Sequence, residues 1–298
     1  MRARASMLPD GRRLHLQDGP IDLIIEAFGT SASVHTAYDT AVIRFQSVLD
    51  ELCSELPLLR TAAAPLMQMP EGTIAKRMAI AVAPYAEKMF ITPMAAVAGA
   101  VAEEILDSMT SAAELSKAYV NDGGDIAIHL SLGTAFRVGM INRPDQPSLF
   151  GSATLYAGDP VRGIATSGWR GRSFSLGVAD AVTVLARTAA VADVAATIIA
   201  NNVDISGSSK IHRVPARSLA PDSDLCDLLV TQSVAELSPG EINCALDRGT
   251  RAADQLRADG LIHSAALHLQ GETRIVAPRH ELPSRMKELE FSRSFVHA

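Results

Sequence analysis

The sequence predicts an α+β protein in which helices pack against layered antiparallel or mixed sheets. Three observations lead to this fold class. Glycine-bearing turns join several strand-like segments, other segments carry apolar residues at helical spacing, and the two kinds interleave along the chain without an internal repeat. Because 48% of the 298 residues are hydrophobic and only 4% are aromatic, we expect a large core packed mostly by aliphatic side chains.

The N-terminal part begins with two β-favourable segments, residues 13–17 and 21–28, separated by Gly19 and Pro20. From Ser33 to Leu52, apolar residues recur every three or four positions, which predicts a helix. A second helix is expected over residues 74–87, and Pro84 must bend or end it.

A third helix is predicted over residues 93–109, with the Thr92 hydroxyl capping its free amides and Pro93 in its first turn. This helix is rich in Ala and Gly, so another part of the molecule must approach its backbone closely. Tight packing against the sheet and room for a bulky flat ligand both explain this composition.

The remainder of the chain alternates between the two kinds of element. Strands are expected at residues 118–121, 125–130, 135–141, 153–157, 163–167, 179–186, 261–269 and 273–277. Helices are expected at residues 188–201 and 238–259. In the second helix, Ser238 and Glu241 form a capping-box pattern and Gly260 follows as a stop.

We expect residues 1–280 to form a single α+β domain, with two coupled halves meeting near residue 110 as the alternative, and residues 281–298 to form a C-terminal tail.

The net charge of −6 and the few aromatic residues argue against nucleic acid as a partner. Charged residues or prolines interrupt every apolar stretch before it reaches membrane-spanning length, and no apolar segment follows Arg2 and Arg4. We therefore expect a cytoplasmic protein that does not bind membranes.

The three cysteines are odd in number, far apart and never in a C-x-x-C spacing, so the sequence suggests neither a disulfide framework nor a zinc site. They are Cys53, Cys226 and Cys244. We expect each to be a buried small hydrophobic residue.

Three short segments carry candidate ligand-binding residues. Gly123, Gly124 and Asp125 occupy a predicted hairpin turn, where glycine amides can bind an anionic or carbonyl-rich ligand and the carboxylate can accept a hydrogen bond. Thr166, Ser167 and Gly168 end a strand and offer two hydroxyls and an amide to a phosphate or a flavin. Ordinary turn chemistry explains both segments equally well.

The third segment places Asp193 and Thr197 four residues apart on an apolar helix, so that both side chains project from one face. A carboxylate among Ala, Val and Ile needs a partner to offset its desolvation. Mg²⁺, a backbone amide or an arginine can each serve as that partner.

In this order, the three segments resemble motifs of the ApbE superfamily, whose best-known members are FAD:protein FMN transferases that use Mg²⁺. The matching residues are Asn121 to Ile126, Ala165 to Gly168, and Ala192 to Thr197, and the resemblance spans roughly residues 90–201. It implies a T-fold-like arrangement of layered sheets and packed helices. It also implies FAD or FMN at Gly123 to Asp125 and Thr166 to Gly168, and Mg²⁺ at Asp193 and Thr197.

The sequence departs from the family pattern in two places. Ala98 stands where the family has a lysine, and the histidine-containing loop expected between the second and third motifs is missing from residues 169–191. The chain looks most similar to a cytoplasmic ApbE-like branch that lacks this loop.

Three functions remain open from the sequence. The leading hypothesis is an ApbE-like protein that binds a flavin or similar heterocyclic small molecule, with Mg²⁺. The second is a catabolic enzyme or redox component acting on a small heterocyclic carboxylic acid, clamped by Arg137, Arg162, Arg170 or Arg172. The third is a noncatalytic ligand-binding or oligomerising protein, with a homodimer as the simplest assembly.

Trp169, directly after Gly168, is either a stacking lid over the ligand or a packed ring.

Overall fold

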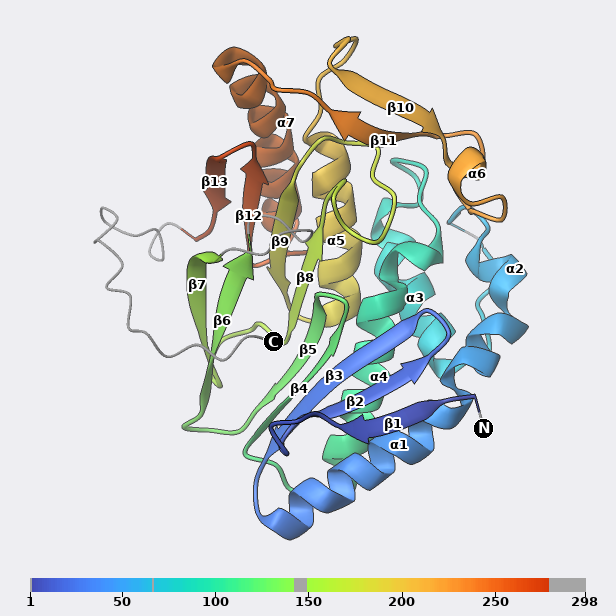
Figure 1. The fold of residues 1–298 in the computed structure, drawn as a ribbon, viewed down its shortest axis with the longest axis vertical. Coiled ribbons are helices and arrows are strands. Elements are labelled where there is room, and N and C mark those ends of the chain that lie inside the picture. Colours follow the sequence, from blue (N-terminus) through green and yellow to red (C-terminus); the bar gives the residue numbers. More distant parts are fainter. Residues whose placement is uncertain (1, 66, 142–148, 279–298) are drawn as a thin grey trace.

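The computed structural model describes residues 2–65, 67–141 and 149–278, and within these ranges helices cover one face of a nine-stranded sheet (Figure 1). The strands are β1 Arg4–Met7, β2 Leu14–Asp18, β3 Ile21–Phe28, β4 Lys117–Asp122, β5 Asp125–Leu130, β6 Ala135–Ile141, β7 Leu149–Tyr156, β8 Gly163–Ser167, β9 Ala181–Ala186, β10 Ile211–Pro215, β11 Leu229–Val234, β12 Ser264–Leu269 and β13 Glu272–Val276. The α-helices are α1 Ser31–Ser54, α2 Leu56–Leu59, α3 Thr73–Val82, α4 Val97–Ala112, α5 Ala189–Asn202, α6 Ala216–Leu219 and α7 Pro239–Ala258. Short 3₁₀ helices span Ala83–Tyr85 and Pro93–Ala96.

The large sheet has the strand order β1-β2-β3-β4-β5-β8-β9-β12-β13, and each neighbouring pair is antiparallel. It joins strands from both ends of the described chain in one continuous sheet. The α+β fold class is therefore confirmed. The division into a single domain with a tail stays a prediction, and the tail itself lies outside the described residues.

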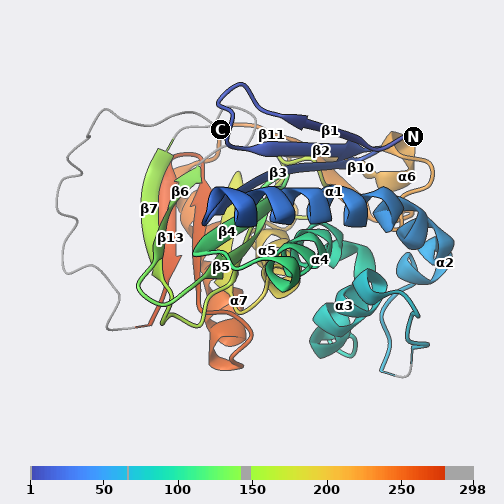
Figure 2. The same cartoon turned by 90° about the horizontal axis from the view of Figure 1, so that it is seen from below.

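Strand alternation divides the sheet into two faces. Every second residue of β3 is buried, with Leu23 and Ile25 fully so, and these side chains belong to the main core beneath the helices. Figure 2 shows α1 and α4 lying under β1, β2 and β3. On the opposite face, Ile128 and Ile164 form a smaller cluster with the β6–β7 hairpin.

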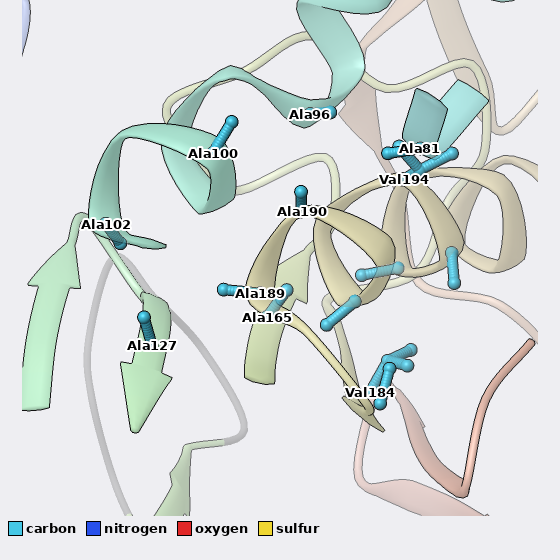
Figure 3. Close-up of a cluster of buried hydrophobic side chains, with 14 of the residues drawn as sticks. Ala81, Ala96, Ala100, Ala102, Ala127, Ala165, Val184, Ala189, Ala190 and Val194 are labelled. Atoms are coloured by element: carbon cyan, nitrogen blue, oxygen red, sulfur yellow. The ribbon is translucent and has the colours of Figure 1, made fainter. Parts of the chain in front are cut away.

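Small side chains let α4, α5 and the sheet approach one another closely (Figure 3). Ala100, Ala102 and Ala189 are fully buried in the main core. A Cβ atom on Gly99 would lie 2.4 Å from the carbonyl oxygen of Ala189. Tight packing thus accounts for the small residues of α4, the first of the two explanations considered above.

Most predicted helices and strands are present, and their ends follow the local signals. Thr188 caps α5, because its hydroxyl accepts from the Val191 amide, and Ser238 with Glu241 forms a complete capping box on α7. Gly260 follows α7 with a φ of +73°. As expected from Pro84, α3 ends at Val82 and a 3₁₀ turn follows.

Two local predictions were wrong. The Thr92 hydroxyl caps no helix amide and instead donates to the carboxylate of Asp224. Cys53, Cys226 and Cys244 are exposed rather than buried. No helix in the described ranges combines the length and apolar character needed to cross a membrane.

Candidate functional site

The β4–β5 turn forms the first part of the candidate site. Gly123 and Gly124 have φ angles of +64° and +116°, the backbone region that favours glycine, and they close the hairpin that the sequence predicted. The Gly124 amide donates to the Asn121 side chain over 2.8 Å. The turn therefore uses this amide itself, and it is not free for a ligand.

Alternation along β4 and β5 turns two carboxylates toward the helices. Val120 and Ala127 lie in the main core, so Asp122 and Asp125, each two residues away along its strand, project from the same face of the sheet. Asp122 is only 7% exposed and Asp125 is half-buried. The two residues are direct cross-strand partners at the end of the hairpin.

The end of β8 divides its two hydroxyls between the two faces. The Thr166 side chain shares a face with Ile164 and lies 2.9 Å from the Thr183 hydroxyl, whereas Ser167 follows Ala165 onto the helix face. The Thr166 amide donates to Asp125 over 3.3 Å. Thr166 therefore contacts the site through its backbone, and Ser167 is the residue whose hydroxyl faces α5.

Gly168 is required by a close backbone approach. A Cβ atom there would lie 2.6 Å from the carbonyl oxygen of Asp180. The next residue, Trp169, donates its backbone amide to Ala179. The chain after β8 is thus held against the residues that lead into β9.

Helix α5 presents Asp193 and Thr197 one turn apart, and both are half-buried. The Gly99 amide donates to the Asp193 carboxylate over 3.1 Å. Of the partners considered from the sequence, the structure provides the backbone amide. It comes from the first turn of α4, which the tight packing at Gly99 brings against α5.

The three carboxylates interact unfavourably with one another. Desolvation raises the pKa of Asp122 to about 7. Desolvation, then repulsion from Asp193 and Asp122, holds the pKa of Asp125 well above its ordinary value. The pKa of Asp193 is raised as well, first by desolvation, although the Gly99 amide opposes the shift. None of the three forms an ion pair with an arginine or lysine of the described chain.

Arg172 and Trp169 lie at the edge of this site. A Cβ atom on Gly123 would meet a terminal nitrogen of Arg172 at 3.0 Å, so the guanidinium lies against the glycine turn, and it donates to the Pro20 carbonyl over 2.8 Å. Arg170 is paired with Asp180 and stacks on the Trp169 ring. The Trp169 indole N–H is buried and has no hydrogen-bond acceptor among the described residues.

The structure brings the three predicted segments together at one end of β4, β5 and β8, against α5. It separates the four arginines: Arg137 lies on the β6–β7 hairpin, and Arg162 precedes β8 at that strand's other end. Sequence reasoning missed Asp122 and Gly99. The sequence could have indicated Asp122, because a two-residue turn makes it the cross-strand partner of Asp125. The Gly99 contact depends on how α4 meets α5, and no local pattern indicates it.

Comparison with known proteins identifies the family. A family model described as "AbpE bacteria" matches residues 5–275, so the chain belongs to this ApbE-like family. Among curated relatives, the UPF0280 protein MK0206 of Methanopyrus kandleri is 35% identical over 164 residues, or 54% of this chain and 62% of that protein. UPF0280 proteins of Methanothrix thermoacetophila and Archaeoglobus fulgidus are 32% and 30% identical, over 57% and 63% of this chain and 70% and 74% of theirs.

Two solved structures align along most of the chain but superpose weakly. The flavinyl transferase ApbE of Pseudomonas stutzeri, in its apo form, has 9% identity and a TM-score of 0.39, with 93% of this chain and 94% of that chain covered. The flavin transferase ApbE of Vibrio cholerae has 13% identity and a TM-score of 0.41, with 93% and 98% covered.

Proposed function

We propose that the protein binds a flavin nucleotide together with Mg²⁺ at the β4–β5 turn, the end of β8 and helix α5. One observation carries this proposal: Asp125 and Asp193 converge from a strand and a helix, and each has a pKa raised first by desolvation. Two carboxylates that repel each other in a partly desolvated site are stabilised by a cation.

The residues present fit Mg²⁺ as a cation shared with a ligand. Asp193, Asp125 and the Thr197 and Ser167 hydroxyls offer the oxygen donors that Mg²⁺ prefers, and one or two carboxylates suffice when water and substrate phosphates complete the shell. Within the described ranges no three His, Cys, Asp or Glu residues are arranged to hold a metal by themselves. We therefore infer that the cation binds well only when the phosphate of a ligand completes its coordination shell. There the cation would neutralise the charge of the phosphate oxygens.

The ligand side of the proposal rests on the glycine turn and Arg172. The exposed guanidinium lies against Gly123, at the same end of the sheet as Asp125, where a phosphate group can reach both the arginine and a cation. The three ordered motifs, which resemble those of FAD:protein FMN transferases, favour a flavin over other nucleotides. Trp169, with its unpartnered indole N–H, supplies an aromatic ring beside Gly168.

Flavin fluorescence and calorimetric titrations with FMN and FAD, each with MgCl₂ and with EDTA, test the proposal. We expect binding that requires Mg²⁺ and weakens by about tenfold or more in Asp193→Asn, because a charged ligand to the cation is lost. Asp254→Asn is the matched control, since this exposed carboxylate lies on α7. Failure of the wild-type protein to bind either flavin in either buffer would overturn the proposal.

A second assay separates binding from FMN transfer. Ala98 replaces the family's lysine and the histidine loop is missing, so we expect flavin binding without release of AMP when FAD, Mg²⁺ and an acceptor protein are supplied. AMP release above a no-protein control would show that transfer proceeds without either feature.

A further inference from the structure

A polar cavity lies toward the end of β5 and β8 that is away from the carboxylates. It has a volume of about 320 Å³ and is lined by α3, α4, β5 and the segments that precede β8 and α5. None of the residues assigned above to the flavin and Mg²⁺ site lines it. This volume is in the range of pockets that hold small metabolites.

Close backbone contacts separate this cavity from the carboxylates. Gly99 packs against Ala189, and a Cβ atom on Gly163 would lie 2.1 Å from the backbone of Thr188. Asp193 lies one helical turn beyond Ala189 on α5, whereas Glu103, which lines the cavity, lies one turn beyond Gly99 on α4. The backbone contacts at Gly99 and Gly163 therefore lie between the cavity and the carboxylate site.

Three arginines and two carboxylates line the cavity, and one arginine uses both carboxylates. Arg77 contacts Glu103 at 3.0 Å and Asp107 at 2.5 Å, and it also reaches Glu104 at 3.5 Å. Glu103 additionally accepts from the Ala190 amide over 2.7 Å. Both carboxylates that line the cavity therefore already have partners within the protein.

The other two arginines, Arg162 and Arg187, have no carboxylate partner among the described residues. Arg162 is held by three backbone carbonyls, those of Ala157, Asp159 and Val161, at 2.6 to 2.8 Å. These bonds fix the guanidinium without neutralising its charge, and two of its five N–H groups remain. Arg187 is exposed and immediately precedes Thr188, the N-cap of α5.

Two further features favour an anion here. The positive end of the α5 dipole lies at Thr188, a residue of the cavity lining. The Nε atom of Arg77 is buried and has no acceptor within the described part of the chain. A fixed guanidinium, a second free to turn and an unsatisfied N–H thus surround a space of metabolite size.

We propose that this cavity binds a small oxyanion ligand, a metabolite whose carboxylate or phosphate group is held by Arg162 and Arg187. Both arginines can donate two parallel hydrogen bonds to such a group. The proposal does not depend on flavin or Mg²⁺ binding at the other end of the strands.

Calorimetric titrations with inorganic phosphate and with malonate, at ionic strength held constant with NaCl, test this site and distinguish the two oxyanions. We expect at least one probe to bind the wild-type protein and to raise its melting temperature, and the affinity to fall about tenfold in Arg187→Gln. Arg251→Gln, which changes an exposed arginine on α7, is the matched control and should bind like the wild type.

Three outcomes would overturn the proposal. The first is that neither phosphate nor malonate binds the wild-type protein. The second is that Arg187→Gln binds both as well as Arg251→Gln does. The third is that Asp193→Asn abolishes binding, which would place the anion at the carboxylate end instead. Equal urea midpoints for the two arginine variants establish that a loss of affinity is not a loss of folding.

Discussion

The two ends of β5 and β8 carry opposite charges, although the same helices cover both. At the turn end, Asp122, Asp125 and Asp193 face one another without an ion pair, whereas at the other end Arg162 and Arg187 lack a carboxylate among the described residues. Elsewhere in the described chain, charges are commonly paired, as in Arg44 with Glu51. Like charges left together at two separate places are costly unless something else neutralises them. The contrast is what we expect if a cation binds at the turn end and an oxyanion binds at the other end, as proposed above.

The largest expected effect comes from the contact that divides the two ends. Gly99→Ala places a methyl group 2.4 Å from a backbone oxygen of α5, which neither backbone can avoid without shifting. We expect a loss of about 3 kcal/mol or more in the free energy of unfolding, measured with urea. Gly240→Ala is the control, because a Cβ atom there meets nothing within 4 Å. Similar stability of the two variants would show that α4 and α5 are not in close contact.

The pH dependence of stability sharpens the account of the carboxylate end. Because the pKa of Asp193 is raised in the folded protein, this group loses its proton first in the unfolded chain as pH rises, and its contribution to stability falls from about pH 4 toward neutrality. In EDTA, Asp193→Asn should therefore be more stable than the wild type at pH 8, by roughly 1–3 kcal/mol, and equally stable at pH 4. Urea unfolding at the two pH values measures this difference. A variant less stable than the wild type at pH 8 would contradict the raised pKa.

A smaller effect distinguishes the two hydroxyls at the end of β8. Thr166→Val removes a hydrogen bond to Thr183 on the far face of the sheet, so we expect a loss of about 1 kcal/mol of stability and unchanged flavin affinity. Ser167→Ala should do the reverse, weakening flavin binding with little effect on the urea midpoint. Equal effects of the two variants on binding would mean that strand alternation does not define the site.

The smallest effect lies away from both ends. Ser238→Ala removes the capping box of α7 and should cost about 0.5–1 kcal/mol of stability. Because α7 supplies none of the residues assigned to either site, flavin and oxyanion affinities should both stay unchanged. Titrating this variant with both ligands shows whether a modest loss of stability alone weakens binding. If either affinity falls, the losses of affinity in the other variants reflect reduced stability rather than loss of a ligand contact.

Local signals predicted most of the fold. Apolar spacing predicted α1, the capping box predicted the start of α7, and the paired glycines predicted the β4–β5 hairpin. The edge strand β1 is short and exposed and has no alternation to detect. The β10–β11 pair with α6 was also missed, and a register shift between His212 and Arg213 interrupts the first of these strands.

The errors and omissions have a common cause in contacts between distant parts of the chain. The Thr92 hydroxyl meets Asp224, far along the sequence, so the local capping pattern misled. Asp125 and Asp193 were recognised one at a time, but their mutual repulsion depends on how α5 lies on the sheet. The cavity at Arg162 and Arg187 requires α3, α4 and β5 together, and no short motif describes it.

A two-by-two calorimetric comparison tests the central claim that one scaffold holds two independent sites of opposite charge. Asp193→Asn and Arg187→Gln are each titrated with FMN in MgCl₂ and with the oxyanion that the wild type binds more tightly. We predict that Asp193→Asn loses FMN binding and keeps the oxyanion, and that Arg187→Gln does the opposite. If each variant loses both ligands, or keeps both, the two ends are not separate sites of opposite charge.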